Sequence, residues 1–174
     1  TRGPSCPVST PVCSFVCPAG VVRMEPRICG EICLSSTGIG NLAHGRLQPG
    51  SGNSGLLVHA VKKTALQQDK KDLLLIDGPP GTGCPLISTV TGVDAVLVVT
   101  EPSVSGLHDL KRVVAVGRQY TKQIFIAINR FDLDESITRS IETWCMAEKI
   151  PILAKIPFDP AVIDAVRNCR PVIR

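Results

Sequence analysis

The sequence has few aromatic side chains and no long hydrophobic run. Aromatic residues make up 3% of its 174 residues, too few for the stacking platforms that bind single-stranded nucleic acids. No apolar run approaches the roughly 18 residues that span a bilayer, and the first residues show no signal-peptide pattern. The net charge of +4 is small, and charges of both signs are scattered. We therefore expect a cytoplasmic protein that neither spans a membrane nor binds nucleic acid.

Cysteine, by contrast, is abundant, with eight residues in the chain, five of them within the first 33. Such a cluster in a cytoplasmic protein indicates metal or redox chemistry before disulfides. Cys13, Cys17 and Pro18 match the second half of the ferredoxin pattern C-x₂-C-x₂-C-x₃-C-P, but Pro7 and Thr10 stand where its first cysteines would be. Cys13 and Cys17 are therefore candidate metal ligands with an incomplete set, and the segment also fits a decayed or truncated ferredoxin.

Two regions of the chain differ in character. Residues 1–53 are rich in Cys, Pro, Gly and Ser, whereas residues 54–174 alternate strand-like and helix-like segments. Short apolar runs predict strands over 73–76, 95–99, 124–128 and 152–156. Helical spacing predicts helices over 55–68 and 107–120, and local signals predict two more, after Asp134 and from Asp159-Pro160. The alternation predicts an α/β fold with a mainly parallel sheet and helices on both faces.

The apolar run that ends at Asp77 predicts the first candidate site. Residues 72–83 read Asp-Leu-Leu-Leu-Ile-Asp-Gly-Pro-Pro-Gly-Thr-Gly. A strand buried in a parallel sheet has this appearance, and open α/β sheets bind ligands at the carboxyl ends of their strands. There the Asp77 carboxylate suits holding a magnesium-bound water near a nucleotide phosphate, and the Gly81 amide suits bonding a phosphate oxygen. The same residues also fit a strand followed by a tight turn.

Several segments, taken in series, resemble one family. They are Arg27-Ile-Cys-Gly-Glu-Ile-Cys-Leu, Gly45-Arg-Leu, Asn53-Ser-Gly-Leu-Leu-Val, Leu75-Ile-Asp-Gly-Pro-Pro-Gly, Val99-Thr-Glu-Pro-Ser-Val-Ser-Gly-Leu-His-Asp-Leu-Lys, Ile128-Asn-Arg-Phe-Asp and Ile156-Pro-Phe-Asp-Pro. Together they resemble the MinD/ParA-like P-loop ATPases that carry an inserted ferredoxin domain, over nearly the whole chain from about Cys13. The resemblance implies a partial ferredoxin-like segment and connector over 1–53. It also implies the C-terminal part of a P-loop NTPase-like α/β domain over 54–174.

The resemblance also implies roles for single residues. Asp77 resembles the family's switch acid, which is the catalytic residue, and Gly81 resembles the glycine that senses the γ-phosphate. Asn129 resembles the asparagine that contacts the base, although a turn former would also suit its position. Pro157 and Asp159 resemble the loop that flanks the adenine, and Asp159 equally fits a helix cap. The implied cofactors are ATP with Mg²⁺ and, through the ferredoxin-like cysteines, a 4Fe-4S cluster.

The chain departs from the family at the phosphate loop. No G-x-x-x-x-G-K-[ST] motif occurs in its 174 residues, and neither Gly38-Ile-Gly40 nor Gly81-Thr-Gly83 is followed by lysine. In the family this loop lies upstream of the inserted ferredoxin. The sequence therefore resembles the C-terminal part of a longer ATPase, or a chain that has lost its nucleotide loop. Whether the chain itself is an enzyme stays open at this point.

Two functions are consistent with these observations. The first is an ATP-dependent switch linked to an iron-sulfur centre, which acts in electron transfer or in the delivery of a cluster or metal. In that reading ATP closes a homodimer, hydrolysis opens it, and the partner is a redox protein or a metalloprotein. The alternative is a non-catalytic binding module of the same fold, in which the sheet is a docking surface.

Overall fold

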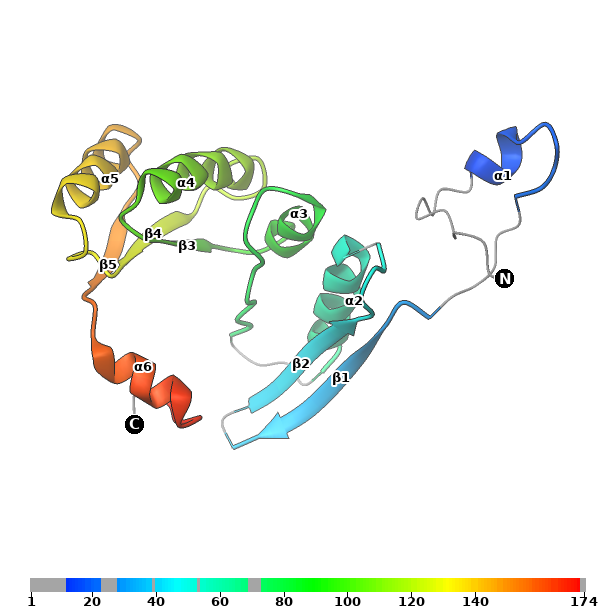
Figure 1. Cartoon of the computed structure of the whole chain (residues 1–174), viewed down its shortest axis with the longest axis horizontal. Helices are drawn as coiled ribbons and strands as arrows, with labels where there is room; N and C mark the ends of the chain where they lie inside the picture. Colours follow the sequence, from blue (N-terminus) through cyan, green and yellow to red (C-terminus); the bar gives the residue numbers. More distant parts are fainter. Residues whose placement is uncertain (1–11, 23–27, 39, 53, 69–72, 173–174) are drawn as a thin grey trace. The chain divides into compact units, whose positions relative to one another are not determined.

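The computed structural model describes residues 12–22, 28–38, 40–52, 54–68 and 73–172. In chain order the elements are α1 (Val12–Val16), β1 (Gly30–Thr37), β2 (Gly40–Leu47), α2 (Ser54–Leu66), α3 (Cys84–Val90), β3 (Val96–Thr100), α4 (Val104–Gly117), β4 (Ile124–Asn129), α5 (Glu135–Ala147), β5 (Ile152–Ile156) and α6 (Pro160–Arg167) (Figure 1). They form two compact units. One comprises the described residues up to Pro79 together with Cys84–Thr89, and the other comprises Pro80–Gly83 and the described residues from Val90 onward.

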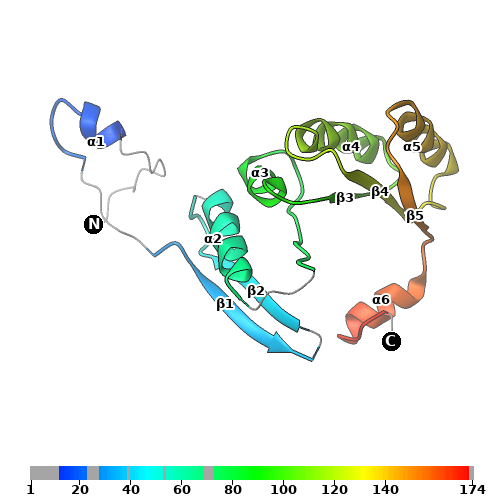
Figure 2. The ribbon, with the colours of Figure 1, turned by 180° about the vertical axis from the view of Figure 1, so that it is seen from behind.

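The first unit is built on an antiparallel hairpin of β1 and β2, paired from Gly30 opposite Leu47 to Thr37 opposite Gly40. Helix α2 packs against β2 (Figure 2). A Cβ atom added to Gly45 would lie 2.8 Å from the Val61 side chain, so glycine is needed for this close approach of helix and strand. The hairpin and its helix therefore hold together through a contact that a larger residue at position 45 would push apart.

The strand predicted over 73–76 is wrong. Residues 73–79 have no regular secondary structure, and the side chains of Leu73 and Leu75 are 80% and 88% exposed. A β-strand forms only where another backbone segment makes hydrogen bonds with its N–H and C=O groups. Within the described parts of the chain, none of the strands pairs with this run. The apolar sequence gives the segment a propensity to form a strand. Strand formation also needs a partner segment, and the sequence of the segment does not specify one.

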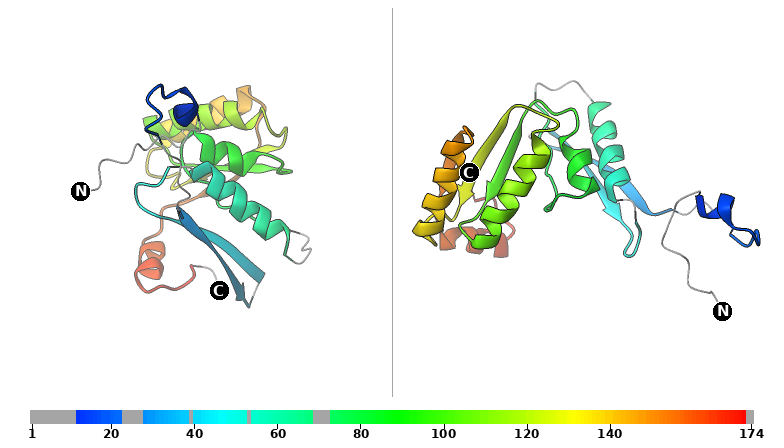
Figure 3. Two further views of the ribbon diagram at one scale, coloured as in Figure 1. Left: turned by 90° about the vertical axis from the view of Figure 1, so that its right-hand side faces the viewer. Right: turned by 90° about the horizontal axis from the view of Figure 1, so that it is seen from above.

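The second unit contains the parallel sheet that the sequence predicts, in the order β3-β4-β5. Helices α4 and α5 lie side by side over one face of it (Figure 3). The buried core between helices and sheet consists of Leu110, Val114, Ile124, Ile126, Ile128, Ile141, Cys145 and Ile150. The α/β fold with a parallel sheet flanked by helices is therefore confirmed.

The two faces of this sheet differ within the second unit. Val98 packs against the core, whereas its neighbours Leu97 and Val99 point to the opposite face because side chains alternate along a strand. Leu97 is 53% exposed and Val99 is 60% exposed. The sequence predicts helices on both faces of the sheet. Among the described residues of this unit, helices cover one face.

The helix starts in the second unit follow local capping chemistry. The Ser103 hydroxyl accepts a hydrogen bond from the backbone N–H of Gly106 at 2.9 Å, and Asp134 and Asp159 cap α5 and α6. The sequence predicts the last two caps correctly, because a cap depends on residues only a few positions apart. Of the helices in the described ranges, none has the length and apolar character needed to cross a membrane.

Candidate functional site

The carboxyl edge of the parallel sheet brings together residues that follow three different strands. In register, Thr100 of β3 lies beside Ile128 of β4, and Asn129, the last residue of β4, lies beside Ile156 of β5. The next residue after β3, Glu101, therefore comes alongside Asn129. Pro157 directly follows β5. We call these three residues, Glu101, Asn129 and Pro157, the sheet-edge group.

A hydrogen bond and an ion pair converge on Glu101 in this group. The Asn129 side-chain Nδ2 donates to the Glu101 carboxylate oxygen Oε1 at 3.4 Å, and Arg130 Nη1 lies 3.3 Å from the same oxygen. Arg130 has a φ of 53°, in the left-handed region that a bulky residue seldom adopts. Such a conformation persists where surrounding contacts hold it, and Glu101 supplies one of them.

The backbone of Glu101 is itself fixed by the start of α4. Its carbonyl accepts a hydrogen bond from the N–H of Ser103 at 2.8 Å. A Cβ atom on Gly106 would collide with that carbonyl oxygen, so this approach of the helix requires glycine. The Thr100 hydroxyl, one residue earlier, donates to the Gly106 carbonyl at 3.3 Å. Glu101 is therefore held in place by the turn that follows its strand.

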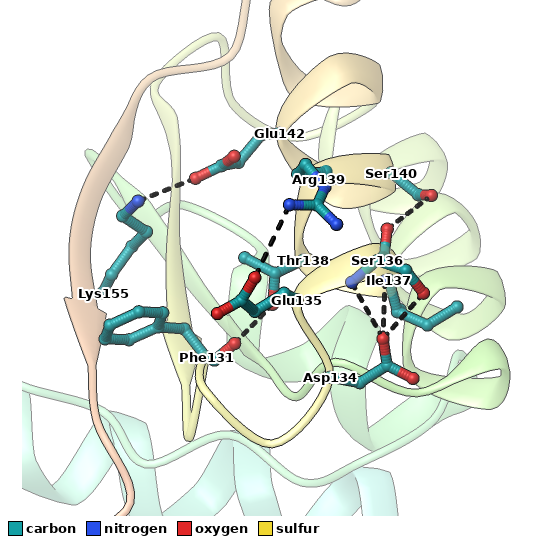
Figure 4. Close-up of polar contacts among 10 residues, drawn as sticks. All are labelled: Phe131, Asp134, Glu135, Ser136, Ile137, Thr138, Arg139, Ser140, Glu142 and Lys155. Atoms are coloured by element: carbon teal, nitrogen blue, oxygen red, sulfur yellow. Dashed lines mark hydrogen bonds and ion pairs between the residues drawn. The ribbon is translucent and has the colours of Figure 1, made fainter.

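The loop after β4 is ordered by the first turn of α5 (Figure 4). The Thr138 hydroxyl donates to the Phe131 carbonyl at 2.7 Å, and the Asp134 carboxylate accepts from the backbone N–H groups of Ser136 and Ile137, both at 2.9 Å. The hydrogen bond from Ile137, and then that from the Ser136 hydroxyl, lower the pKa of Asp134. Asn129 is thus the last residue before a loop whose shape is fixed by side-chain hydrogen bonds.

Lys155 in β5 borders the same loop. Its Nζ lies 2.9 Å from Glu142 Oε1 of α5 and 5.4 Å from the centre of the Phe131 ring (Figure 4). An exposed ion pair of this kind contributes little to stability. Its effect here is to place an ammonium group over the aromatic face of the loop residue that follows Arg130.

The loop after β5 is tied to the loop after β4. Phe158 donates its backbone N–H to Asp132 Oδ1 at 2.7 Å, and Phe131 donates to the Ile156 carbonyl at 3.1 Å. Asp159 caps α6, and its carboxylate accepts from the Ala161 N–H at 2.8 Å. The capping alternative for Asp159 therefore describes what its side chain does, while Pro157 keeps its place beside the sheet edge.

The glycine expected to face the phosphate lies in an irregular turn. Gly81 has a φ of +88°, and a Cβ atom there would meet nothing within 4 Å, so the backbone conformation rather than crowding demands glycine. Next to it, the Thr82 hydroxyl accepts from Arg112 Nη2 of α4 at 3.1 Å. Asp77 belongs to the other unit, where it is exposed in the irregular run after residue 72.

The candidate cluster ligands are only partly described. Cys13 lies in α1, and its side chain is outside the described residues; Cys17 follows that helix directly and is half-buried. Hydrogen bonds from the backbone N–H groups of Val21, and then Ala19, lower the pKa of the Cys17 thiol. A 4Fe-4S cluster takes four thiolates, and in the described ranges no three metal-ligating side chains gather. The described ligand set does not fit a complete cluster.

Sequence reasoning missed three polar residues that complete these loops. Arg130, Asp132 and Arg112 each make a contact that fixes a loop near a predicted site residue, and the role of Glu101 could not be assigned. The position of Glu101 just beyond an apolar run predicts its place at the carboxyl edge beside Asn129, and the same signal was available for Arg130. Residues that directly follow neighbouring parallel strands come to one edge of the sheet, so positions 101 and 130 belong with Asn129 once the strand order is known.

One solved structure shares the fold. The cell division ATPase MinD of Pyrococcus furiosus superposes with a TM-score of 0.51 at 26% sequence identity, over 67% of this chain and 48% of that one.

Curated proteins point the same way. An uncharacterized protein of Methanocaldococcus jannaschii is 34% identical over 127 residues, covering 73% of this chain and 42% of the relative. The septum site-determining protein MinD of Helicobacter pylori is 32% identical over 128 residues, covering 66% and 47%. An uncharacterized ATP-binding protein of M. jannaschii is 25% identical over 105 residues, covering 60% and 40%.

These matches extend over part of each relative. The chain spans a little under half the length of each of these curated relatives and of the solved structure. No protein-family profile matches it. None of these relatives is named for a ferredoxin or an iron-sulfur centre. The solved structure shares the α/β fold with this chain. In sequence and in fold, this chain is similar to the MinD-like ATPases.

Proposed function

We propose that this chain supplies the base-binding part of an ATP-dependent switch of the MinD type. The observation that carries the proposal is the sheet-edge group, in which Asn129 is anchored by Glu101 at the carboxyl ends of parallel strands. Ligands of open α/β sheets bind at such an edge. The similarity to MinD proteins and to an ATP-binding relative supports ATP as the nucleotide.

The residues at this edge suit the base of the nucleotide. Asn129 is half-buried at the tip of its strand, and its amide carries both a donor and an acceptor, which match the adjacent acceptor and donor of adenine. Pro157 offers a rigid apolar surface beside it. Asp159 would act only by setting the start of α6, because its carboxylate already caps that helix.

The residues of this chain suit the phosphate end less completely. Gly81 presents its backbone without a side chain, and the Asp77 carboxylate is exposed and suits a water bound to Mg²⁺. No lysine-bearing glycine loop occurs in the sequence. ATP supplies phosphoryl-transfer chemistry when it is bound. The second unit's own contribution would be to orient the base at Asn129 and to offer the backbone amide of Gly81 to a phosphate oxygen.

Titration with Mg²⁺-ATP, followed by ¹⁵N-correlated NMR of the whole chain, tests this proposal. We expect shifts that concentrate on the Asn129 side-chain amide and the backbone of residues 157–159. Asn129→Ala should weaken binding about tenfold, since a lost hydrogen-bonding pair costs on the order of 1–3 kcal/mol. Asn41→Ala, which removes an exposed amide from β2, is the matched control and should leave affinity unchanged. Equal affinity in the two variants would overturn the assignment.

We further propose that the switch works with a redox or metal centre and acts as a homodimer that ATP closes. In that reading hydrolysis opens the dimer and gates electron transfer or the delivery of a cluster or metal to a redox protein or metalloprotein. The supporting observation is the Cys17 thiol, whose surrounding backbone N–H groups favour the thiolate that binds iron. No step is assigned to a cluster, because the described ligand set is incomplete.

Anaerobic purification followed by iron and sulfide analysis tests the redox part. With two correctly spaced cysteines, we expect the chain to hold much less than one 4Fe-4S cluster per molecule. Whatever iron it holds should fall on Cys17→Ser and stay unchanged on Cys169→Ser, which alters an exposed cysteine at the other end of the chain. Stoichiometric iron and sulfide lost on Cys17→Ser would contradict the incomplete ligand set. An iron content that Cys17→Ser leaves unchanged would instead favour the alternative function, a non-catalytic binding module without a metal centre at Cys17.

A further inference from the structure

We propose that Glu101 is a specificity-determining residue, which orients the Asn129 amide so that it accepts adenine and rejects guanine. This inference rests on the proposed function, because it concerns how the same edge reads a base. The sequence offers Glu101 no assigned role. In the structure it lies beside Asn129 across the β3-β4 register and takes the Asn129 Nδ2 group at 3.4 Å.

The direction of this hydrogen bond settles which end of the amide is free. A carboxylate has only acceptors, so it must face the NH₂ end of Asn129 and not its carbonyl. Arg130 Nη1 lies 3.3 Å from the same Glu101 oxygen. The Asn129 carbonyl Oδ1 is thereby turned away from Glu101 and left to a ligand, together with the second hydrogen of Nδ2.

This orientation discriminates between the purines. At the six-position adenine carries an NH₂ donor, whereas guanine carries a carbonyl acceptor. A fixed Oδ1 accepts from the adenine amino group and opposes the guanine carbonyl, because two acceptors then face one another. An unanchored asparagine would turn its amide over and donate to guanine instead. The hydrogen bond from Asn129 to Glu101, which we call the anchor, therefore turns an asparagine that could bind either base into one that selects adenine.

The anchor is held on both sides. The Glu101 carbonyl accepts from Ser103 at 2.8 Å and is closely approached by Gly106, so the start of α4 fixes its backbone. On the other strand, the loop after Asn129 is fixed by the hydrogen bond from Thr138 to the Phe131 carbonyl. Both partners thus have little freedom to separate, as an orienting contact requires.

Affinities of the whole chain for ATP and for GTP, each with Mg²⁺, test the inference. We expect the unchanged chain to prefer ATP, and we expect Glu101→Gln to reduce the ATP/GTP affinity ratio about tenfold. Glutamine has nearly the same size, but its side chain both donates and accepts, so it leaves the asparagine free to turn over. The loss of preference should arise mainly from tighter GTP binding, an effect that simple damage to the fold would not produce.

Two controls separate the anchor from the charge around it. Glu135→Gln removes a carboxylate that pairs with Arg139 elsewhere in the same unit, and should leave the ratio unchanged. Arg130→Gln removes the ion pair and keeps the contact between Glu101 and Asn129. This substitution should weaken the binding of ATP and of GTP alike and leave the ATP/GTP affinity ratio unchanged.

The outcomes distinguish this inference from the proposed function. If ATP shifts the Asn129 amide but Glu101→Gln leaves the ATP/GTP ratio unchanged, the base site stands and the role of Glu101 is wrong. If Arg130→Gln lowers the ratio as much as Glu101→Gln does, the charge pair and not the amide orientation is responsible, and the inference is again overturned. If neither nucleotide perturbs Asn129 in the unchanged chain, both the inference and the proposed function fail.

Discussion

The purified 174-residue chain is expected to show no ATP hydrolysis above the uncatalysed background. Phosphoryl transfer is accelerated by positioning and by positive groups placed where charge develops, namely a loop of backbone amides, a lysine and Mg²⁺. Loss of a single such donor typically costs on the order of 10²–10³ in rate. The sequence has neither the amide loop nor its lysine, because no G-x-x-x-x-G-K-[ST] motif is present. Several stabilising groups are missing together, so the expected loss is much larger than for one donor.

Release of inorganic phosphate in the presence of Mg²⁺ measures this directly. The control is Asp77→Ala, which removes the carboxylate proposed to hold a magnesium-bound water and should leave the background rate unchanged. Robust turnover that Asp77→Ala abolishes would contradict the prediction, and would mean that other residues of this chain supply the missing positive charge. Turnover indifferent to Asp77 would indicate a contaminating ATPase. Binding of ATP at Asn129 is a separate expectation, since the base end of the site does not depend on the phosphate loop.

The second large effect concerns the core that carries the sheet edge. Ile141→Ala should lower the free energy of unfolding of the second unit by about 2–5 kcal/mol, because the isoleucine is 0% exposed in the middle of the packed cluster. The substitution removes buried hydrophobic surface and leaves a cavity that neighbouring side chains fill only in part. Ile126 and Ile128 of β4 belong to the same cluster and would lose packing contacts, and Asn129 lies at the end of that strand.

Urea denaturation followed by the fluorescence of Trp144, the single tryptophan of the chain, reports this loss. Trp144 packs against the same core and is therefore sensitive to its unfolding. Met146→Ala lies on the same helix with a side chain that is 81% exposed, and should change stability by less than about 0.5 kcal/mol. A similar loss in the two variants would show that α5 is not anchored through Ile141.

Local chemistry accounts for most of what the sequence predicts correctly. The strands over 124–128 and 152–156 are predicted from short, mostly apolar runs, and the structure has them as the buried strand β4 and the largely exposed strand β5. The caps at Asp134 and Asp159 depend on a side chain and a backbone amide two or three residues apart. Such interactions form within a single turn, so the sequence alone predicts them.

Pairing between distant segments accounts for what the sequence does not predict. The run over 73–76 has the composition of a buried strand but no described neighbour to pair with. The hairpin of β1 and β2 was not predicted, because its strands are mostly exposed and lack a clear alternation of buried residues. A signal was available at its turn, where Gly38 and Gly40 lie close together in the sequence and Thr37 pairs with Gly40.

The sheet-edge group also combines local features, which the sequence predicts, with a long-range contact, which it does not. The sequence singles out Asn129 and Pro157 by their place after apolar runs, which is a local property. The contact between Asn129 and Glu101 joins residues 28 positions apart and follows only from the order β3-β4-β5. Recognition of the anchor therefore needed the register of two parallel strands, which no pattern within either strand specifies.

The proposed contact between Asn129 and the base of ATP can be observed by intermolecular nuclear Overhauser effects. With Mg²⁺-ATP bound to the isotopically labelled chain, the adenine ring protons should show contacts to the Asn129 side-chain amide and to the ring protons of Pro157. The same contacts should be absent in Asn129→Ala. Adenine contacts confined to residues away from the carboxyl edge of β3, β4 and β5, with none to Asn129, would contradict the account.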